Sequence, residues 1–341
     1  MVRVVLAAPD KFRGTASAAE VAGAIAAGAE RAGWGCVLLP LADGGEGLLA
    51  ALGGANRYAQ VTGPLGEPVE AGWRLEGTTA VVEMALASGL VLAGGRHHND
   101  PEAATTAGTG ELVAAAAAAG ARTIVVGLGG SATTDGGDGA LAALDGLVPF
   151  PEHGLEVRVA CDVQTTFVDA ARVFGPQKGA GPAQVKRLTA RLERLADEYE
   201  RRFGADVRGL PGAGAAGGLA GGLAAAGATL EPGFGLVAGL VGLDDALARA
   251  GLVVTGEGRL DETSFAGKVV GSLLERCRGT IPVFAVVGAA AGDFHDRLDY
   301  VSLVERFGES AARADTLTCI ERVVEAELER RVENCSSTGW A

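Results

Sequence analysis

The sequence predicts an α/β protein built from two domains with mainly parallel sheets, and three observations support this. The chain has 341 residues, which exceeds the size of one comfortable hydrophobic core. Short apolar, β-branched runs alternate with alanine-rich helical patterns. Glycine-rich segments that carry Asp or Glu follow four of these runs. We expect these segments at the carboxyl ends of strands, where an open α/β sheet binds its ligand.

The composition is that of a globular protein, with 48% hydrophobic and 21% charged residues. The net charge of -13 argues against nucleic acid or an anionic membrane surface as a partner, although local donors can still bind small anions. The five cysteines are scattered without a CxxC pair, so we expect no disulfides, no zinc site and a cytoplasmic location. We also expect neither a signal peptide nor a membrane-spanning segment.

The most informative stretch is Ile124 to Gly139, IVVGLGGSATTDGGDG. Its first half predicts a strand buried on both faces, and a helical pattern follows its second half. A glycine-rich turn between a strand and a helix can direct backbone amides at a phosphate, while its hydroxyls and carboxylates serve the phosphate and a metal. A plain tight turn that needs positive φ would have the same glycines, so this motif alone leaves both interpretations open.

The same order of strand, glycine with an acid, and helix occurs three more times. The segments are PDKFRGT from Pro9, ADGGEG from Ala42 and TGEGRLDE from Thr255. Four loops that each combine glycine with an acid after a predicted strand favour a ligand site over four unrelated turns.

Local patterns predict further elements. Ser17 and Glu20 form a capping-box pattern that opens a helix, and the turn-rich segment Tyr58–Thr79 indicates a small antiparallel excursion. Other strands are expected at residues 2–8, 36–41, 157–163, 252–255, 281–288 and 300–304. Helices are expected at residues 17–33 and 182–203, and from 314 to a frayed tail at 333–341.

Several motifs have two interpretations. Thr105–Gly110 is either a helix N-cap or a threonine cluster that faces a substrate. Asp162, after a predicted strand, is a metal ligand, a base or a helix cap. The glycine-rich segment Leu210–Gly227 needs a close backbone approach, either of a nucleotide or of a neighbouring helix. His97 and His98 are interpreted as part of a solvated loop rather than as metal ligands.

Nine segments resemble, in order, the signature segments of the glycerate kinase family in its bacterial glycerate 2-kinase branch. They are APDKFRGT, PLADGGEG, TGPLGEPVEA, GTGEL, GLGGSATTDGG, ACDV, VFGPQKGA, LPGAGAAGGL and VVTGEGRLD. Together they span Ala8 to about Lys268. One glycine motif would be weak evidence, but nine in register are specific.

This resemblance implies ATP- and Mg²⁺-dependent phosphorylation of D-glycerate, in this branch to 2-phosphoglycerate. It also implies two Rossmann- or flavodoxin-like α/β domains, one inserted in the other, with the active site in the cleft between them. We place the outer domain at residues 1–77 plus 243–341 and the inserted domain at 78–242. A kinase for another small hydroxy acid and a non-catalytic metabolite-binding regulator remain as alternatives, and the protein is expected to be either a monomer or a homodimer.

Phosphoryl transfer needs cations at the transferring group and a carboxylate to orient the attacking hydroxyl, while an arginine fork suits the glycerate carboxylate. We expect catalytic roles for Asp10, Asp43, Asp135, Lys178, Asp261 and Lys268. Substrate binding is expected from Arg13, Gly44, Gly45, Glu46, Ser131, Thr133, Glu257 and Arg259. ATP is expected at Gly129, Gly130, Gly212, Gly214 and Gly217, and Mg²⁺ at Asp135 and Asp162. Each residue has an alternative interpretation as an ordinary salt-bridged or capping residue.

Overall fold

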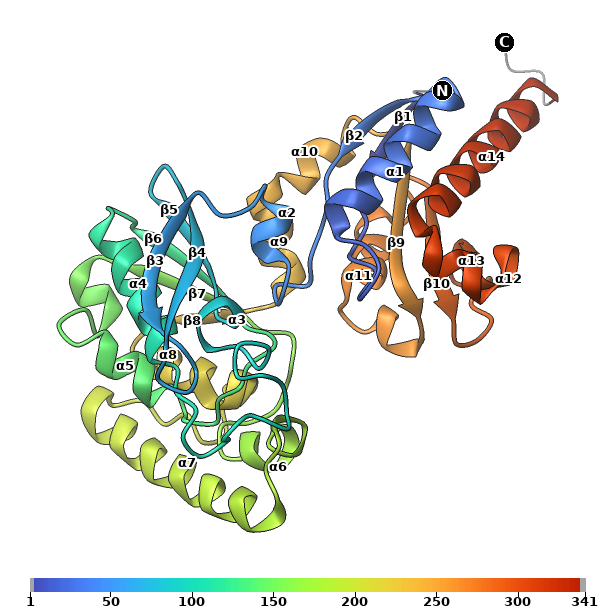
Figure 1. Ribbon diagram of the computed structural model, residues 1–341. Helices are drawn as coiled ribbons and strands as arrows, with labels where there is room; N and C mark the ends of the chain where they lie inside the picture. The colour runs from blue at the N-terminus through green and yellow to red at the C-terminus, as the bar shows by residue number, and fades with distance from the viewer. Residues whose placement is uncertain (1–2, 338–341) are drawn as a thin grey trace. The chain divides into compact units, whose positions relative to one another are not determined.

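The computed structural model describes residues 3–337, with side chains described up to residue 333. The chain forms two compact units, which are described separately (Figure 1). The first unit comprises the chain up to Asp43, Ala50–Leu52 and the chain from Val237 onward. The second unit comprises Gly44–Leu49 and Gly53–Leu236, so it is inserted into the sequence of the first.

The first unit is built on a five-stranded parallel sheet of order β11-β10-β9-β1-β2. Its strands are β1 (Val4–Ala7), β2 (Gly35–Leu38), β9 (Leu252–Leu260), β10 (Val283–Ala290) and β11 (Asp299–Ser302). The helices assigned wholly to it are α1 (Ala18–Arg31), α10 (Leu243–Leu247), α11 (Val269–Cys277), α12 (Leu303–Phe307), α13 (Glu309–Ala314) and α14 (Thr316–Ser337), with the 3₁₀ helix η4 (Glu262–Phe265).

Helices α1 and α14 bury apolar side chains in one core together with β1, β9 and β10. The capping box expected at the start of α1 is present, because Ser17 accepts from the Glu20 amide and Glu20 accepts from the Ser17 amide. A Cβ atom at Gly28 would lie 2.6 Å from the Glu321 carbonyl oxygen of α14. Glycine at this position therefore allows the two helices to approach closely.

The second unit has a six-stranded sheet of order β3-β4-β5-β6-β7-β8. The strands are β3 (Arg57–Thr62), β4 (Pro68–Glu76), β5 (Thr79–Glu83), β6 (Thr123–Gly127), β7 (Glu156–Ala160) and β8 (Thr229–Glu231). The pairs β3–β4 and β4–β5 are antiparallel, and the remaining pairs are parallel. Around this sheet lie α3 (Ala85–Ser88), α4 (Ala107–Ala118), α5 (Asp138–Ala143), α6 (Ala170–Phe174), α7 (Pro182–Phe203), α8 (Leu219–Ala225), η1 (Phe150–His153), η2 (Pro176–Lys178) and η3 (Ala215–Gly218).

The predicted class of two α/β units with mainly parallel sheets is confirmed, but the chain crosses between the units earlier than expected. The crossing expected near residue 78 lies between residues 43 and 53, within and just beside α2 (Leu48–Ala51). The reason is that the antiparallel strands β3 and β4 extend the sheet of the second unit rather than closing the first. The return crossing follows Leu236 inside α9 (Gly233–Val241), where residue 242 was expected.

Several expected element boundaries are shifted, and two of them differ by five residues. The strand expected to end at Thr255 continues through the TGEGRL letters to Leu260, because β10 pairs with it along that length. Helix α14 continues to Ser337, where a frayed tail was expected from residue 333, and residues 338–341 lie outside the described part. No helix among the described residues has the length and apolarity needed to cross a membrane.

Candidate functional site

A pocket of about 470 Å³ opens at the carboxyl ends of β1 and β9 in the first unit. This first-unit pocket brings together seven of the residues expected from the sequence. They are Asp10, Arg13, Asp43, Glu257, Arg259, Asp261 and Lys268. Parallel strands end at one edge of their sheet, which explains why segments far apart in the sequence meet here.

Strand β9 supplies the centre of this pocket. Glu257 and Arg259 are two residues apart in a strand, so both side chains lie on the same face of the sheet. Gly256 and Gly258 alternate with them on the opposite face. A Cβ atom at Gly256 would overlap the Val286 carbonyl, and one at Gly258 would lie 3.3 Å from the Arg13 amide nitrogen. The GEG sequence thus combines a carboxylate that lines the pocket with glycines that allow close packing on the opposite face.

The first-unit pocket contains two acids whose pKa values are raised. Burial raises the pKa of Asp10, and the nearby Asp43 charge adds to the increase, while Lys11 opposes it. Burial also raises the pKa of Glu257 to about 7, opposed by a Ser264 hydrogen bond and by the Lys268 charge. Glu257 is 7% exposed, and its Oε1 has no hydrogen-bond partner among the described residues.

Asp261 and Lys268 are engaged with the turn that follows β9. One carboxylate oxygen of Asp261 accepts from the Thr263 amide at 2.8 Å and from its hydroxyl at 2.6 Å. These bonds cap the helix η4 and lower the pKa of Asp261. Lys268 Nζ donates to the same Thr263 hydroxyl at 2.7 Å. Both residues line the pocket, and Asp261 also has the capping role that the alternative interpretation described.

A second pocket, of about 360 Å³, lies in the second unit and is defined by the segment after β6. Gly129, Gly130, Ser131 and Lys178 line it, as expected for residues that would hold phosphate. The backbone here pairs with the segment after α3, because Gly89 and Ser131 form an isolated antiparallel bridge. The segment Gly129–Ser131 is therefore an extended loop, and α5 begins seven residues later at Asp138.

Lys178 is 2% exposed yet lines this second-unit pocket. Its Nζ donates to the Thr133 carbonyl at 2.5 Å. Burial lowers the pKa of the Lys178 ammonium to about 7, and the Asp135 charge opposes this decrease. Thr133 itself is fully buried, and its hydroxyl donates to the Ala216 carbonyl at 3.3 Å.

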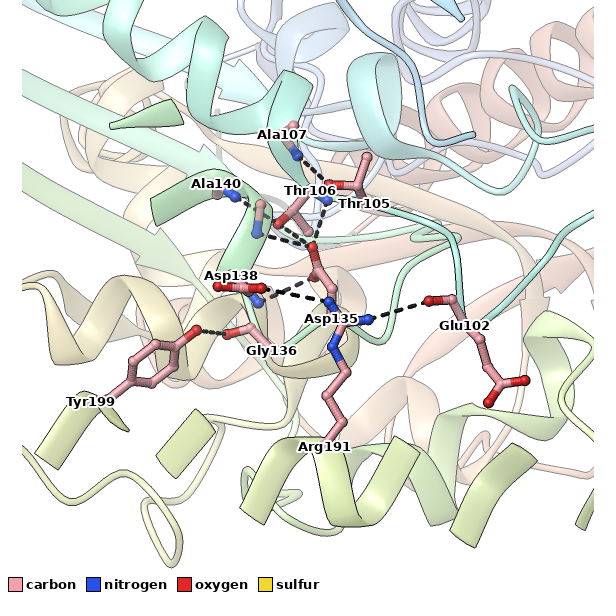
Figure 2. A network of polar contacts seen from close by, with 12 residues as sticks. Glu102, Thr105, Thr106, Ala107, Asp135, Gly136, Asp138, Ala140, Arg191 and Tyr199 are labelled. Carbon is pink, nitrogen blue, oxygen red and sulfur yellow. Dashed lines mark hydrogen bonds and ion pairs between the residues drawn. The ribbon is translucent and has the colours of Figure 1, made fainter. Parts of the chain in front are cut away.

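Asp135 is the centre of a buried hydrogen-bond network (Figure 2). Its Oδ2 accepts from the amide and the hydroxyl of Thr106, both at 2.8 Å, and from the Gly139 amide at 3.3 Å. Its Oδ1 accepts from the Gly137 amide at 3.2 Å. Asp135 thus caps the N-terminus of α5 and links it to the start of α4, and the helix amides that a phosphate would need are already bonded.

The threonine segment before α4 belongs to the same network. Thr106 Oγ1 accepts from the Ala140 amide at 3.0 Å while it donates to Asp135. Neither helix receives a side-chain cap from its own N-cap residue. The expected N-capping by threonine is present, because Thr105 Oγ1 accepts from the Ala107 amide of α4 at 3.1 Å. The Asp135 carboxylate, which comes from a different loop, adds a bond from the Thr106 amide.

The glycines at 212, 214 and 217 are explained by packing within the second unit. A Cβ atom at Gly217 would overlap the Thr133 carbonyl, and one at Gly214 would overlap the Thr166 carbonyl. At Gly212 it would lie 3.0 Å from Cys161 Sγ. The close backbone approach that the sequence required is thus made by two neighbouring loops. The adjacent Ala216 lines the second-unit pocket and has φ +52°, a strained value for a residue with a Cβ atom.

The ADGGEG segment contributes to both units. Asp43 lines the first-unit pocket, whereas Gly44, Gly45 and Glu46 belong to the second unit. A Cβ atom at Gly130 would overlap the Glu46 carboxylate, and one at Gly44 would lie 2.6 Å from Gly233 Cα. Glu46 therefore packs directly on the loop that lines the second-unit pocket.

The two residues expected to hold Mg²⁺ do not form a metal site. All the bonds of Asp135 described above go to protein donors, and Asp162 Oδ1 accepts from the Gly233 amide at 2.7 Å. Among the described side chains, no group of three or more His, Cys, Asp or Glu residues is placed to hold a metal ion. These contacts match the helix-cap interpretation of Asp162, because Gly233 begins α9.

Sequence reasoning missed two polar residues that hold the second-unit loops. Glu83, 6% exposed at the end of β5, accepts from the Leu49 amide at 2.5 Å. Asn99 donates from Nδ2 to the carbonyls of Ala132 and Lys178, at 3.0 and 2.9 Å. Glu83 is an acid at the last position of an apolar strand, a pattern from which a buried polar role could have been predicted. Asn99 lies in a polar loop, where no sequence pattern indicates such a role.

The chain matches the model of the glycerate kinase family over residues 5–152 and 147–338. It is 39% identical to the glycerate 2-kinase of Escherichia coli K12, with 85% of this chain and 86% of that protein covered. It is 38% identical to a glycerate kinase of Bacillus subtilis 168, with 85% and 86% covered. A crystal structure assigned to glycerate kinase 2 of Salmonella typhimurium LT2 has a TM-score of 0.85 and 32% identity, and covers 98% of this chain and 100% of that one.

The chain belongs to the glycerate kinase family. This finding confirms the resemblance drawn from the nine sequence segments, and it supports a kinase activity for this chain. The individual roles expected for the site residues remain predictions.

Proposed function

We propose that this protein transfers the γ-phosphoryl group of ATP to D-glycerate and that the product is 2-phosphoglycerate. The observation that carries the proposal is the first-unit pocket of a glycerate kinase family member, where a buried glutamate and three aspartates line the same pocket as Arg13 and Arg259. A hydroxy acid needs a cation for its carboxylate and an acceptor for its hydroxyl proton, and this pocket offers both. The relative from Escherichia coli is named a glycerate 2-kinase, which supports the 2-hydroxyl as the acceptor.

We assign the two substrates to the two pockets. Arg13 and Arg259 of the first-unit pocket suit the glycerate carboxylate, since a guanidinium binds a carboxylate through two parallel hydrogen bonds. Gly129, Gly130, Ser131 and Lys178 suit the phosphates of ATP, which enters as its Mg²⁺ complex. Within the ADGGEG segment, Asp43 lines the first-unit pocket, and Glu46 packs against Gly130 of the loop that lines the second-unit pocket.

The direct test is to incubate the purified protein with D-glycerate and MgATP and to identify the product by phosphorus NMR. A 2-phosphoglycerate signal with stoichiometric ADP is expected. A 3-phosphoglycerate signal would refute the proposed position of transfer, and no phosphorylated glycerate would refute the activity. Size-exclusion chromatography with light scattering of the same sample would separate the predicted monomer from the predicted homodimer.

A kinase for a larger hydroxy acid is the second candidate, because a pocket of about 470 Å³ is in the range that encloses drug-sized ligands. A panel of two- to six-carbon hydroxy acids, with ATP consumption as the readout, separates the two. Glycerate is expected to have the highest kcat/KM. A cytoplasmic location also remains a proposal, supported by the four described cysteines, all of which are free thiols.

A further inference from the structure

Glu257 differs from the other acids of the first-unit pocket in its burial and in its hydrogen bonding. It is 7% exposed, and its Oε1 is a buried oxygen without a hydrogen-bond partner among the described residues. A buried carboxylate oxygen that is left unpaired is unfavourable, because it loses its hydrogen bonds to water without gaining a donor from the protein. A catalytic role is one of the reasons for which a folded protein keeps such an oxygen.

The neighbouring acids are less suited to receive a proton. Asp261 accepts two hydrogen bonds from Thr263 that favour its charged form. One oxygen of Asp10 accepts from the Lys11 amide at 2.7 Å. Glu257 therefore combines a buried acceptor oxygen that has no partner with a place in the lining of a pocket that also contains Arg13 and Arg259.

We propose that Glu257 is the general base that takes the proton of the acceptor hydroxyl, an inference that rests on the proposed function. The O–H bond of the hydroxyl breaks and its proton passes to Glu257 Oε1. The hydroxyl oxygen forms a bond to the γ-phosphorus of ATP, and the bond from that phosphorus to the β–γ bridging oxygen breaks. The electron pair of that bond leaves with ADP, and Glu257 returns its proton to solvent after product release.

The ordinary carboxyl pKa would make Glu257 a weak proton acceptor at neutral pH, and its surroundings change this. Burial raises the pKa of Glu257 to about 7, near the range in which general bases are most effective. The charged groups that line the pocket around it come from every element packed there: Asp10, Lys11, Arg13, Asp43, Arg259, Asp261, Lys268 and Arg313. Among them, the Lys268 charge lowers the pKa of Glu257, whereas the Asp10 and Asp261 charges raise it.

The test compares Glu257→Gln with the wild-type protein under MgATP and D-glycerate. Gln has the same shape but cannot accept the proton, so kcat is expected to fall about 10²- to 10⁴-fold while KM for glycerate changes little. The acid limb of the kcat/KM profile, expected near pH 7 in the wild-type protein, should disappear from the residual activity of the variant. Glu262→Gln is the matched control, because Glu262 is exposed on the same turn and pairs with Arg297 outside the pocket.

An inactive wild-type protein would refute the proposed function and the base together. An active wild-type protein with a variant within five-fold in kcat, or with a raised KM and an unchanged kcat, would refute the base alone. If circular dichroism shows that Glu257→Gln is unfolded, Glu257→Asp replaces it. That change keeps the carboxylate but withdraws it by one methylene, so kcat should fall and the acid limb should persist.

Discussion

The segments that line the first-unit pocket and the loop after β6 are both rich in glycines and acids. In the structure, however, the acids of the two regions have different hydrogen-bond partners. Asp135, in the second unit, accepts four hydrogen bonds from neighbouring amides and a hydroxyl. Glu257, in the first unit, has a buried oxygen with no such partner. An acid surrounded by protein donors organises the fold, whereas a pocket-lining acid with an unpaired buried oxygen is a candidate for contact with a substrate.

This comparison predicts that changes in the second-unit loops act mainly on stability, with Lys178 as the exception because it lines a pocket. Lys178→Ala should lower kcat about 10²- to 10³-fold, the usual effect of removing a group that stabilises transition-state charge. Steady-state kinetics with the fold checked by circular dichroism measures this. Lys186→Ala, on the solvated face of α7, is the control. If turnover by Lys178→Ala remains within a few-fold of the wild-type rate, the ammonium has no role in transfer.

Gly217→Ala is expected to give the largest loss of stability, because the new Cβ atom would overlap the Thr133 carbonyl and φ is +71°. A loss of about 2–4 kcal/mol in the free energy of unfolding is expected from steric overlap and left-handed strain. Urea denaturation measures it. Gly209→Ala is the matched control, since nothing lies within 4 Å of its Cβ position. Equal stability of the two variants would show that the 212–217 segment is not closely packed in solution.

Asp135→Asn should destabilise the protein by about 1–3 kcal/mol, because an amide group would face donors with at most one acceptor oxygen. Thermal unfolding monitored by circular dichroism gives the difference. Asp138→Asn serves as the control, because Asp138 is half-exposed and contacts Arg191 only at 3.6 Å. A stable Asp135→Asn protein that has lost activity would instead indicate a direct role of Asp135 in catalysis.

A gain in stability that depends on pH is predicted for Glu257→Gln. The folded-state pKa of Glu257 is raised from 4.5 to about 7, so the wild-type protein binds this proton more tightly when folded. The stability from this group is complete below pH 4.5 and is lost as pH rises through 7. The Gln variant lacks this loss, so at pH 8 it should exceed the wild-type stability by about 1–3 kcal/mol and match it near pH 4. Urea titrations at both pH values measure the difference, and parallel curves would contradict the raised pKa.

Many of the residues that line the first-unit pocket could be predicted, because glycines and charged residues that directly follow an apolar strand can be recognised in the sequence. Asp10, Arg13, Asp43 and Glu257 follow or occupy apolar strands, and parallel strands bring such positions to one edge. Long-range partners could not be predicted in the same way. Asn99 reaches Lys178 and Ala132 across 79 and 33 residues, and no local pattern marks it.

The sequence by itself determined the alternation of strands and helices, the capping box of α1, the full extent of α7 and the family, because these depend on local periodicity and on motifs in order. Only the tertiary structure decided how each acid is used, that β9 continues through Glu257 and Arg259, and that β3 and β4 belong to the second sheet. The physical reason is that a carboxylate becomes a cap or an open acceptor according to the donors around it. Those donors come from segments that only folding brings together.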